Sequence, residues 1–344
     1  MIRREYRLLI VLLTLVLVSA TCLVAGPARA DAMDDCIAKK IPSATEDTTV
    51  RDLREACLKE TGAATVIVEK QPESLAKIRA ENESRTELHP HSLTAYKQNY
   101  LLPYTYASRE NPLYTEAGLH YDHEETKFQF SFRFPLTRDD LFVKGDGLDL
   151  GYTQKSFWQT YNTSLSEPFR ETDYNPEIFY TMPLNFQPWG GYTDLRLGLE
   201  HESNGMGITN GVNLSRSWNR IYAKFIYSKD NYVIAVRPWY RIPESQNTSP
   251  TDTTGDDNPD IEKYLGYFDL TGALRYRQFE FSLLARNNLR TSNNYGAIEL
   301  GMSFPLYHRL RGYAQYFNGY GDSLIDYNQS VTRYGIGILF TDIL

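Results

Sequence analysis

The feature that most constrains this chain is an alternation of apolar and polar residues, which recurs from about residue 113 to the C-terminus. In residues 127–134, four phenylalanines alternate with Lys, Gln, Ser and Arg. Side chains of a strand point alternately to its two faces, so the four phenylalanines are expected to line one face. One such strand would suit a soluble sheet equally well, and the recurrence of the pattern decides between the two.

Twelve segments read as strands. Twelve is an even number, and most segments approach the roughly ten residues that a tilted strand needs to cross a membrane. The last segment ends close to the C-terminus, where closure of a barrel leaves no unpaired edge in lipid. The sequence therefore predicts an all-β fold, a twelve-stranded antiparallel transmembrane β-barrel. The segments are 113–121, 127–136, 147–161, 176–185, 193–204, 218–228, 232–242, 264–276, 279–288, 295–306, 309–321 and 331–340.

The amino-acid composition agrees with this prediction. The chain holds 26 tyrosines, 16 phenylalanines and 4 tryptophans, and membrane barrels carry aromatic girdles at both interfaces. After residue 30, no segment approaches the roughly 20 apolar residues of a spanning helix. The mature chain is therefore expected either to be soluble or to cross the membrane as strands.

The first thirty residues have the pattern of a secretory signal peptide. Three arginines precede an apolar run at 8–18, and residues 28–30 read Ala-Arg-Ala, a cleavage site before Asp31. A membrane anchor is the alternative, but the apolar run is short for one. Cleavage removes four Arg and one Glu, which changes the net charge from −7 to −10. Such an acidic protein is a poor nucleic-acid binder.

Residues 31–99 are predicted to form a polar periplasmic extension with a helix near 50–58, and residues 100–344 to form the barrel. Cys36 and Cys57 are the two cysteines that remain after cleavage. Because the periplasm is oxidising, we expect a disulfide between them, with two buried thiols as the alternative. With the extension in the periplasm, the connections at 162–175, 205–217 and 243–263 are extracellular, where outer-membrane barrels place their longer loops.

The segment 193–204 carries the residues that suggest chemistry. Its leucines at 195, 197 and 199 share one face, which in a barrel meets lipid, while Arg196, Glu200 and Glu202 face the interior. By parity His201 and Ser203 continue the lipid face at the extracellular end. On the next strand, Asn219 falls in line with apolar residues of the same face.

Ser203, His201 and Asn219 fit the roles of nucleophile, base and orienter. Ser203 would attack an ester carbonyl, and His201 would take its proton and return it to the leaving alcohol. Asn219 would fix the imidazole tautomer, and a neutral amide avoids most of the desolvation cost of a carboxylate facing lipid. The alternative is that these are ordinary polar residues at the membrane interface.

Several motifs together resemble outer membrane phospholipase A. Residues 201–205 (HESNG) and 215–220 (SRSWNR) match the active-site motifs of that family. Further matches are residues 152–159 (YTQKSFWQ), 168–172 (PFRET), 256–261 (DDNPDI) and 319–328 (GYGDSLIDYN). The resemblance spans most of the barrel, and no motif of residues 31–99 takes part in it.

The resemblance implies an outer-membrane enzyme that dimerises, binds Ca²⁺ and hydrolyses acyl esters of phospholipids, and we expect the dimer to be reversible. It implies that Ser203, His201 and Asn219 form the catalytic triad and that the Gly205 backbone N–H helps to bind the oxyanion. It also implies a set of calcium ligands: the Ser215 hydroxyl, the Met206 carbonyl, waters, and Ser166 from the partner subunit. All are oxygen donors, which calcium prefers.

This chain departs from the family pattern at two places. Met206 stands where the family usually has arginine, although only the backbone carbonyl is the implied ligand. The stretch from Gly205 to Ser215 is also about four residues longer than the family pattern, and it shapes the implied calcium site.

Gln154 points to a dimer independently of the resemblance. It shares the lipid face of its strand with apolar residues, and an amide in lipid is costly without a partner. A second Gln154 across a twofold axis would supply one, and the alternative is inward orientation through a local bulge.

Other functions remain open at this point. A passive barrel, either a pore or a structural protein, would need the alternation but not the three polar residues on one outer face. The opposite charges of the interior could cross-link and plug the lumen, which favours the enzyme. After the enzyme and the passive barrel, a catalytically inactive family member is the third possibility.

The acidic loop 252–260 lacks the spacing of a calcium-binding hand loop and is expected to be a solvated surface loop.

Overall fold

The computed structural model describes residues 74–79, 82, 93–137, 140–249, 252–307 and 310–344, with residues 36, 39, 40, 56 and 57. The chain divides into two compact units, residues 1–70 and 71–344. The predicted signal peptide and most of the predicted helix at 50–58 lie outside the described residues. Residues 71–99 group with the barrel unit, and the predicted boundary between residues 99 and 100 stays a prediction.

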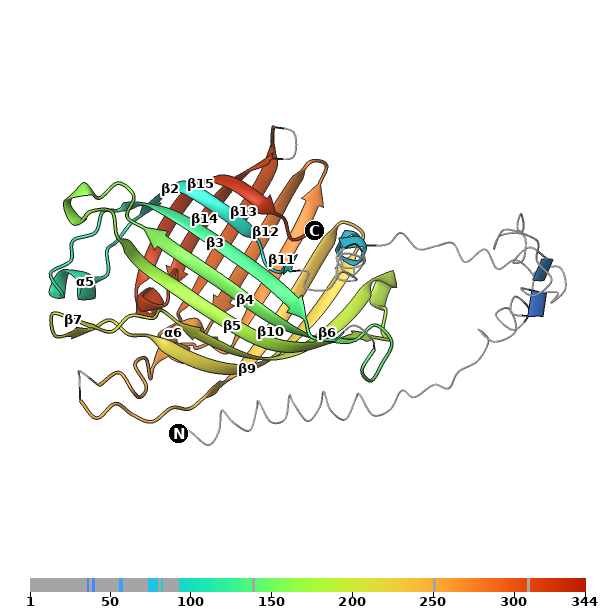
Figure 1. Ribbon diagram of the computed structural model, residues 1–344, viewed down its shortest axis with the longest axis horizontal. Coiled ribbons are helices and arrows are strands. Elements are labelled where there is room, and N and C mark those ends of the chain that lie inside the picture. The colour runs from blue at the N-terminus through green and yellow to red at the C-terminus, as the bar shows by residue number, and fades with distance from the viewer. Residues whose placement is uncertain are drawn as a thin grey trace. The chain divides into compact units, whose positions relative to one another are not determined.

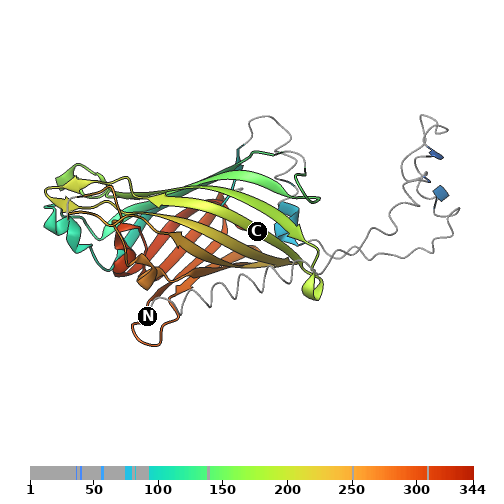
Figure 2. The same cartoon turned by 90° about the horizontal axis from the view of Figure 1, so that it is seen from below.

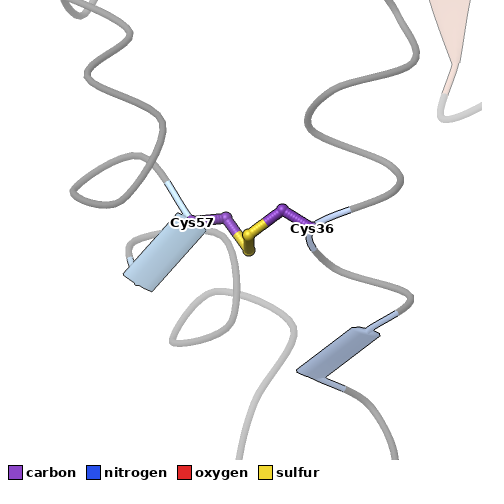
Figure 3. The surroundings of a disulfide bond; sticks show 2 residues. All are labelled: Cys36 and Cys57. Atoms are coloured by element: carbon purple, nitrogen blue, oxygen red, sulfur yellow. A yellow bond between two sulfur atoms is a disulfide. The ribbon is translucent and has the colours of Figure 1, made fainter.

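Within the first unit, Cys36 and Cys57 form a disulfide, with Cα atoms 5.8 Å apart (Figure 3). The two residues are 21 positions apart in the sequence. This confirms the pairing that the oxidising compartment predicted.

The second unit is a closed antiparallel barrel (Figures 1 and 2). Each strand pairs with its neighbours in sequence, and the last strand pairs with the first to close the sheet. In the described part of the chain the barrel has twelve strands, as predicted. They are β2 (Asn99–Ala107), β3 (Glu124–Pro135), β4 (Gly147–Trp158), β5 (Phe169–Leu184), β6 (Tyr192–Ser203), β9 (Ser217–Lys229), β10 (Tyr232–Ile242), β11 (Phe268–Tyr276), β12 (Phe279–Asn287), β13 (Gly296–Tyr307), β14 (Leu310–Tyr320) and β15 (Ser330–Thr341).

Short helices and short strands lie at the two ends of the barrel. We call the end that carries the connections after β2, β4, β6, β10, β12 and β14 the loop end. Figure 1 shows α5, β7 and α6 gathered there. The loop end holds α5 (Pro112–Glu116), η2 (Thr163–Leu165), β7 (Ile208–Thr209), β8 (Val212–Asn213), α6 (Ile261–Leu265) and η4 (Ile325–Asn328). The opposite end holds β1 (Thr94–Ala95), which pairs with β3, and η3 (Pro188–Gly190). None of the described helices is long and apolar enough to span a membrane.

The first strand was predicted in the wrong place. Residues 113–121 form α5 and the loop after it, and the first strand of the barrel is β2. Asn111 caps α5 by accepting a hydrogen bond from the Leu113 N–H, and Pro112 occupies the first turn. Both are ordinary signals of a helix start. The number of strands and their direction are unchanged, because one strand replaces the other.

Pro103 explains why the sequence pattern of β2 was missed. The register of β2 shifts between Leu102 and Thr105 against β3, and again opposite Ile336–Ile338 of β15. Proline has no N–H for the ladder, so it is confined to such bulges. A Cβ atom on Gly337 would lie 2.1 Å from the Leu101 carbonyl oxygen, so only glycine allows the bulge to lie this close to β15.

Several other strand boundaries also differ from the prediction, and three of them are informative. β5 begins at Phe169 and not at 176, β4 ends at Trp158 and not at 161, and β11 begins at Phe268 because α6 precedes it. Each shift lies at the loop end, where tertiary contacts and not alternation decide where a strand stops.

The two faces of the barrel wall are chemically opposite. The outer face exposes leucines, isoleucines and aromatic rings, which suits lipid. The interior is filled by an aromatic cluster that includes Phe179, Trp218 and Trp239 and by paired charges. On β6 and β9, Arg220 forms ion pairs with Glu200 and Glu202, so the predicted cross-linking of interior charges is confirmed for these residues.

Candidate active site

The ladder between β6 and β9 places the three predicted catalytic residues on one surface. His201 lies directly opposite Asn219, and Ser203 opposite Ser217. Leu199 and Ile221, the preceding and following residues of the same face, are 47% and 53% exposed. The alternation of side chains therefore directs His201, Ser203 and Asn219 to the outer face of the barrel, at its loop end.

His201 and Asn219 are in direct contact. The His201 Nδ1 atom lies 2.9 Å from Asn219 Oδ1. An amide oxygen only accepts hydrogen bonds, so Nδ1 carries the proton and Nε2 keeps a free lone pair. This is the tautomer that a general base needs. The Asn219 amide nitrogen in turn donates to Glu244 Oε1 at 2.8 Å, a contact that sequence reasoning missed.

Ser203 is the last residue of β6, half-buried and opposite Tyr174 of β5. Among the described residues its hydroxyl has no hydrogen-bond partner, so the structure brings Ser203 to the face of His201 without a direct bond between them. Hydrogen bonds of a catalytic pair often tighten only when substrate binds.

The backbone at His201 has an unusual partner. Between the pairs Tyr174–Ser203 and Glu177–Glu200, β5 passes through Pro176, which has no N–H to donate. The His201 carbonyl instead accepts a hydrogen bond from the Asn175 side-chain amide at 2.9 Å. Asn175 therefore satisfies the orphan carbonyl and holds β6 in place beside the imidazole.

The long stretch between Gly205 and Ser215 is a small hairpin. β7 and β8 pair across Asn210 and Gly211, which have positive φ angles of 52° and 84°. Asn-Gly is the sequence that this two-residue turn favours, so the hairpin was predictable. The Asn210 side chain donates to the Ala117 carbonyl beyond α5 at 2.7 Å. The hairpin tip is therefore attached to the neighbouring loop through Asn210.

Asn204 fastens the base of this hairpin. Its buried Oδ1 atom accepts from the N–H groups of Met206 at 3.3 Å and Arg216 at 2.9 Å, and Nδ2 donates to the Leu214 carbonyl at 2.9 Å. One side chain thus joins the segment that contains Met206 to the segment that contains Ser215.

The predicted calcium ligands provide oxygen donors. The Ser215 hydroxyl and the Met206 carbonyl have no hydrogen-bond partner within the described part of the chain. The Met206 side chain packs beside the buried cluster of Tyr114, Leu214 and Ile325. Ser166 lies in a different loop, exposed and with a positive φ of 61°. No cluster of three or more His, Cys, Asp or Glu side chains suited to a metal occurs among the described residues.

The acidic loop after β10 is held by hydrogen bonds and by an ion pair, within the loop and with neighbouring strands. The N–H groups and hydroxyls of Thr248 and Thr254 hold the pKa of Asp252 below its ordinary value. Asp256 pairs with Arg241 at 2.5 Å, and Asp257 accepts from Asn213 at 2.9 Å. These carboxylates form hydrogen bonds and an ion pair within the loop and with neighbouring segments, as expected of a structured surface loop.

Gln154 lies on the outer face of β4. The pairing of β4 is regular on both sides from Gly147 to Phe157, so inward orientation through a bulge does not occur. Its amide already has partners: the Tyr152 hydroxyl donates to Oε1 and Nε2 donates to the Ser156 hydroxyl, each at 3.1 Å. One N–H and one lone pair remain available to a neighbouring molecule.

Comparison with known proteins identifies the family. A family model described as phospholipase A1 matches residues 76–340. Phospholipase A1 of Klebsiella pneumoniae is 40% identical over 264 residues, which cover 74% of this chain and 84% of that protein. This chain belongs to the phospholipase A1 family.

Two solved structures of the family have the same barrel. The Salmonella typhi outer membrane phospholipase, a dimer with bound calcium, superposes with a TM-score of 0.65 at 36% identity, over 76% of this chain and 97% of that one. The Escherichia coli outer membrane phospholipase A, as an active-site mutant with alanine in place of an asparagine, superposes with a TM-score of 0.66 at 34% identity, over 76% and 98%. The chain is therefore a phospholipid-hydrolysing enzyme of the outer membrane, as the sequence predicted.

The hydrogen bonds of Asn204 lead to a prediction about the hairpin. Asn204→Ala removes three bonds at the hairpin base, so amide hydrogen exchange in residues 205–215 should rise and lipid hydrolysis should fall. Exchange in the β6 and β9 ladder should stay slow, because these strands pair independently of Asn204. Asn204→Asp keeps the two acceptor bonds and should lie between wild type and the alanine variant. Unchanged hydrogen exchange in Asn204→Ala would show that the Asn204 hydrogen bonds do not hold the hairpin base.

Proposed function

We propose that this enzyme hydrolyses acyl esters of glycerophospholipids, with phospholipase A1, A2 and lysophospholipase activity, in a calcium-dependent reaction at the outer leaflet. Ser203, His201 and Asn219 form its catalytic triad. The observation that carries the proposal is the 2.9 Å contact between His201 Nδ1 and Asn219 Oδ1 on the lipid-facing surface, with Ser203 on the same face. The asparagine of the E. coli relative, whose replacement defines an active-site mutant, supports the role of Asn219.

In this mechanism the Ser203 hydroxyl attacks the ester carbonyl while its proton passes to His201 Nε2. The tetrahedral intermediate collapses, the ester C–O bond breaks, and His201 gives the proton to the leaving alcohol. Water then repeats the sequence on the acyl-serine and releases the fatty acid. The Gly205 N–H donates to the developing oxyanion. Gly205 has a φ of 62°, and a Cβ there would lie 3.0 Å from the Tyr174 ring, so glycine suits this position.

The oxygen donors near the triad fit a calcium ion. The Met206 carbonyl and the Ser215 hydroxyl would hold it, together with waters and Ser166 of the partner subunit. When bound, calcium offsets negative charge on the reacting carbonyl oxygen. The calcium-bound dimer of the S. typhi relative supports both the ion and the dimer.

A passive barrel explains fewer of the observations. The Arg220 and Glu200 side chains on β6 and β9 are paired and buried, and a pore gains nothing from His201, Ser203 and Asn219 on its outer wall. No specific observation favours a pore or an inactive barrel over the enzyme.

The nucleophile assignment can be tested by one substitution. Ser203→Ala should abolish lipid hydrolysis and leave a folded, heat-resistant barrel, because Ser203 lies at a strand end on the outer surface. Asn219→Ala should reduce kcat less, since an orienting residue contributes less than a nucleophile. Full residual activity of the Ser203 variant, measured on phospholipid in mixed micelles, would overturn the triad.

Calcium should be needed for turnover and not for folding. The proposed ligands lie in loops outside the strand ladder, so a chelator should remove hydrolysis and leave the β circular-dichroism spectrum unchanged. Ser215→Ala should raise the calcium concentration that gives half-maximal activity. Either barrel unfolding on chelation or undiminished hydrolysis would refute this role.

Dimerisation should depend on Gln154. Hydrogen bonds between membrane segments contribute about 0.6 to 2 kcal/mol, so one such contact gives a reversible dimer. Gln154→Leu should weaken dimerisation roughly threefold to thirtyfold and lower activity at low protein density, with recovery at high density. Ile298→Leu, on the outer face of β13, is the control. Crosslinking with an unchanged dimer fraction would exclude the Gln154 contact.

A further inference from the structure

Glu244 adds a fourth member to the His201–Asn219 hydrogen-bond chain. It lies two residues beyond the end of β10, in the loop that leads to α6, and is half-buried. Ile242 pairs directly with Asn219 on β9, so a residue two positions further on is directed to the same face. Its Oε1 atom accepts a hydrogen bond from Asn219 Nδ2 at 2.8 Å.

This contact settles which way the Asn219 amide points. An asparagine can turn its oxygen or its nitrogen toward a neighbour, and only the hydrogen-bond network decides between them. A carboxylate can only accept, so the amide nitrogen must face Glu244. The oxygen then faces His201 Nδ1 and fixes the protonated tautomer there. Without Glu244, the reversed amide would offer an N–H to Nδ1 and favour the wrong tautomer.

The same contact gives the imidazole a nearby negative charge. A hydrogen bond to a charged acceptor is stronger than one between neutral groups, and it polarises the amide that donates it. The Asn219 oxygen thus becomes a better acceptor for the imidazolium that forms when His201 takes the serine proton. Asn219 itself stays neutral on the lipid-facing surface.

The loop around Glu244 is held in place. The Asp256 N–H donates to the Ser245 carbonyl at 2.7 Å, and Asp256 pairs with Arg241 on the other side of Glu244. A Cβ on Gly255 would lie 2.4 Å from the Ser245 carbonyl oxygen, so glycine permits this close approach. Glu244 is therefore anchored through the residues that flank it.

We propose that Glu244 is a positioning residue for catalysis, which acts on His201 through Asn219 in a Ser203–His201–Asn219–Glu244 chain. This inference rests on the proposed triad. The Glu244 carboxylate is hydrogen-bonded to Asn219 and not to His201 or Ser203, so its effect is expected on kcat and not on KM.

The first test replaces the carboxylate by a neutral group of the same shape. Glu244→Gln should lower kcat about tenfold, because Asn219 then donates to a neutral acceptor and not to a charged one, with KM for phospholipid unchanged. Glu116→Gln on α5 removes the same charge from an exposed position of the loop end and should match wild type. A Glu244→Gln enzyme with wild-type kcat would overturn the inference.

The second test predicts that Glu244→Gln has opposite effects on kcat in the wild-type enzyme and in the Asn219→Asp variant. In Asn219→Asp, the new carboxylate has no N–H to donate and is repelled by Glu244. Adding Glu244→Gln to this variant relieves the repulsion and supplies a donor, so it should raise kcat several-fold, whereas it lowers kcat in the wild-type background. A residue that merely supports the fold would lower kcat in both backgrounds, and that result would overturn the positioning role.

Ser203→Ala separates this inference from the proposed function. Suppose that Ser203→Ala is inactive and that Glu244→Gln leaves kcat unchanged both in the wild-type enzyme and in Asn219→Asp. The triad then stands and the role of Glu244 fails. If Ser203→Ala is active, the triad itself fails. Heat-resistant migration of every variant on gels confirms that the barrels compared are folded.

Discussion

The structure depends on one constraint: in lipid, each backbone N–H and C=O must find its partner inside the protein, because an unpaired group costs several kcal/mol. The ladder between β15 and β2 closes the barrel and removes the last free edge. The same constraint explains local irregularities. Pro103 lies in a bulge, and Asn175 donates to the His201 carbonyl where Pro176 cannot. Because the strands use their backbone groups for pairing, chemistry is left to side chains and to the loop end.

Buried ion pairs give the wall near the loop end a rigid support. Glu125 accepts from both Arg170 and Arg333, which come from β5 and β15, and Asp322 pairs with Arg333 and Lys127. Loss of one partner would leave a buried charge, at a cost of about 3 to 5 kcal/mol. These contacts join β3 to β5 and to β15, which are not its direct neighbours in the sheet. β5 pairs in turn with β6, which carries His201 and Ser203.

Alternation predicted the barrel, eleven of its strands and the face on which the proposed catalytic residues lie, because the two faces of the barrel wall meet such different surroundings. It failed for β2, where Pro103 interrupts the period, and at residues 113–121, where the cap Asn111-Pro112 outweighs a weak pattern. The Asn210-Gly211 hairpin could have been predicted from its turn. Glu244 could not, since it lies 25 residues from Asn219 in a loop whose path no local pattern determines.

The proposed triad faces lipid, and this places conflicting demands on its third member, Asn219. A carboxylate would best stabilise the imidazolium, but a charge on the outer wall is costly where water is scarce. Asparagine removes this cost and introduces an ambiguity, because its amide can point either way. In the proposed chain, Glu244 resolves the ambiguity from the loop end beyond β10, where charge is more easily hydrated. Separating the neutral contact group from the charged one thus allows a lipid-facing histidine to have both the correct tautomer and a nearby negative charge.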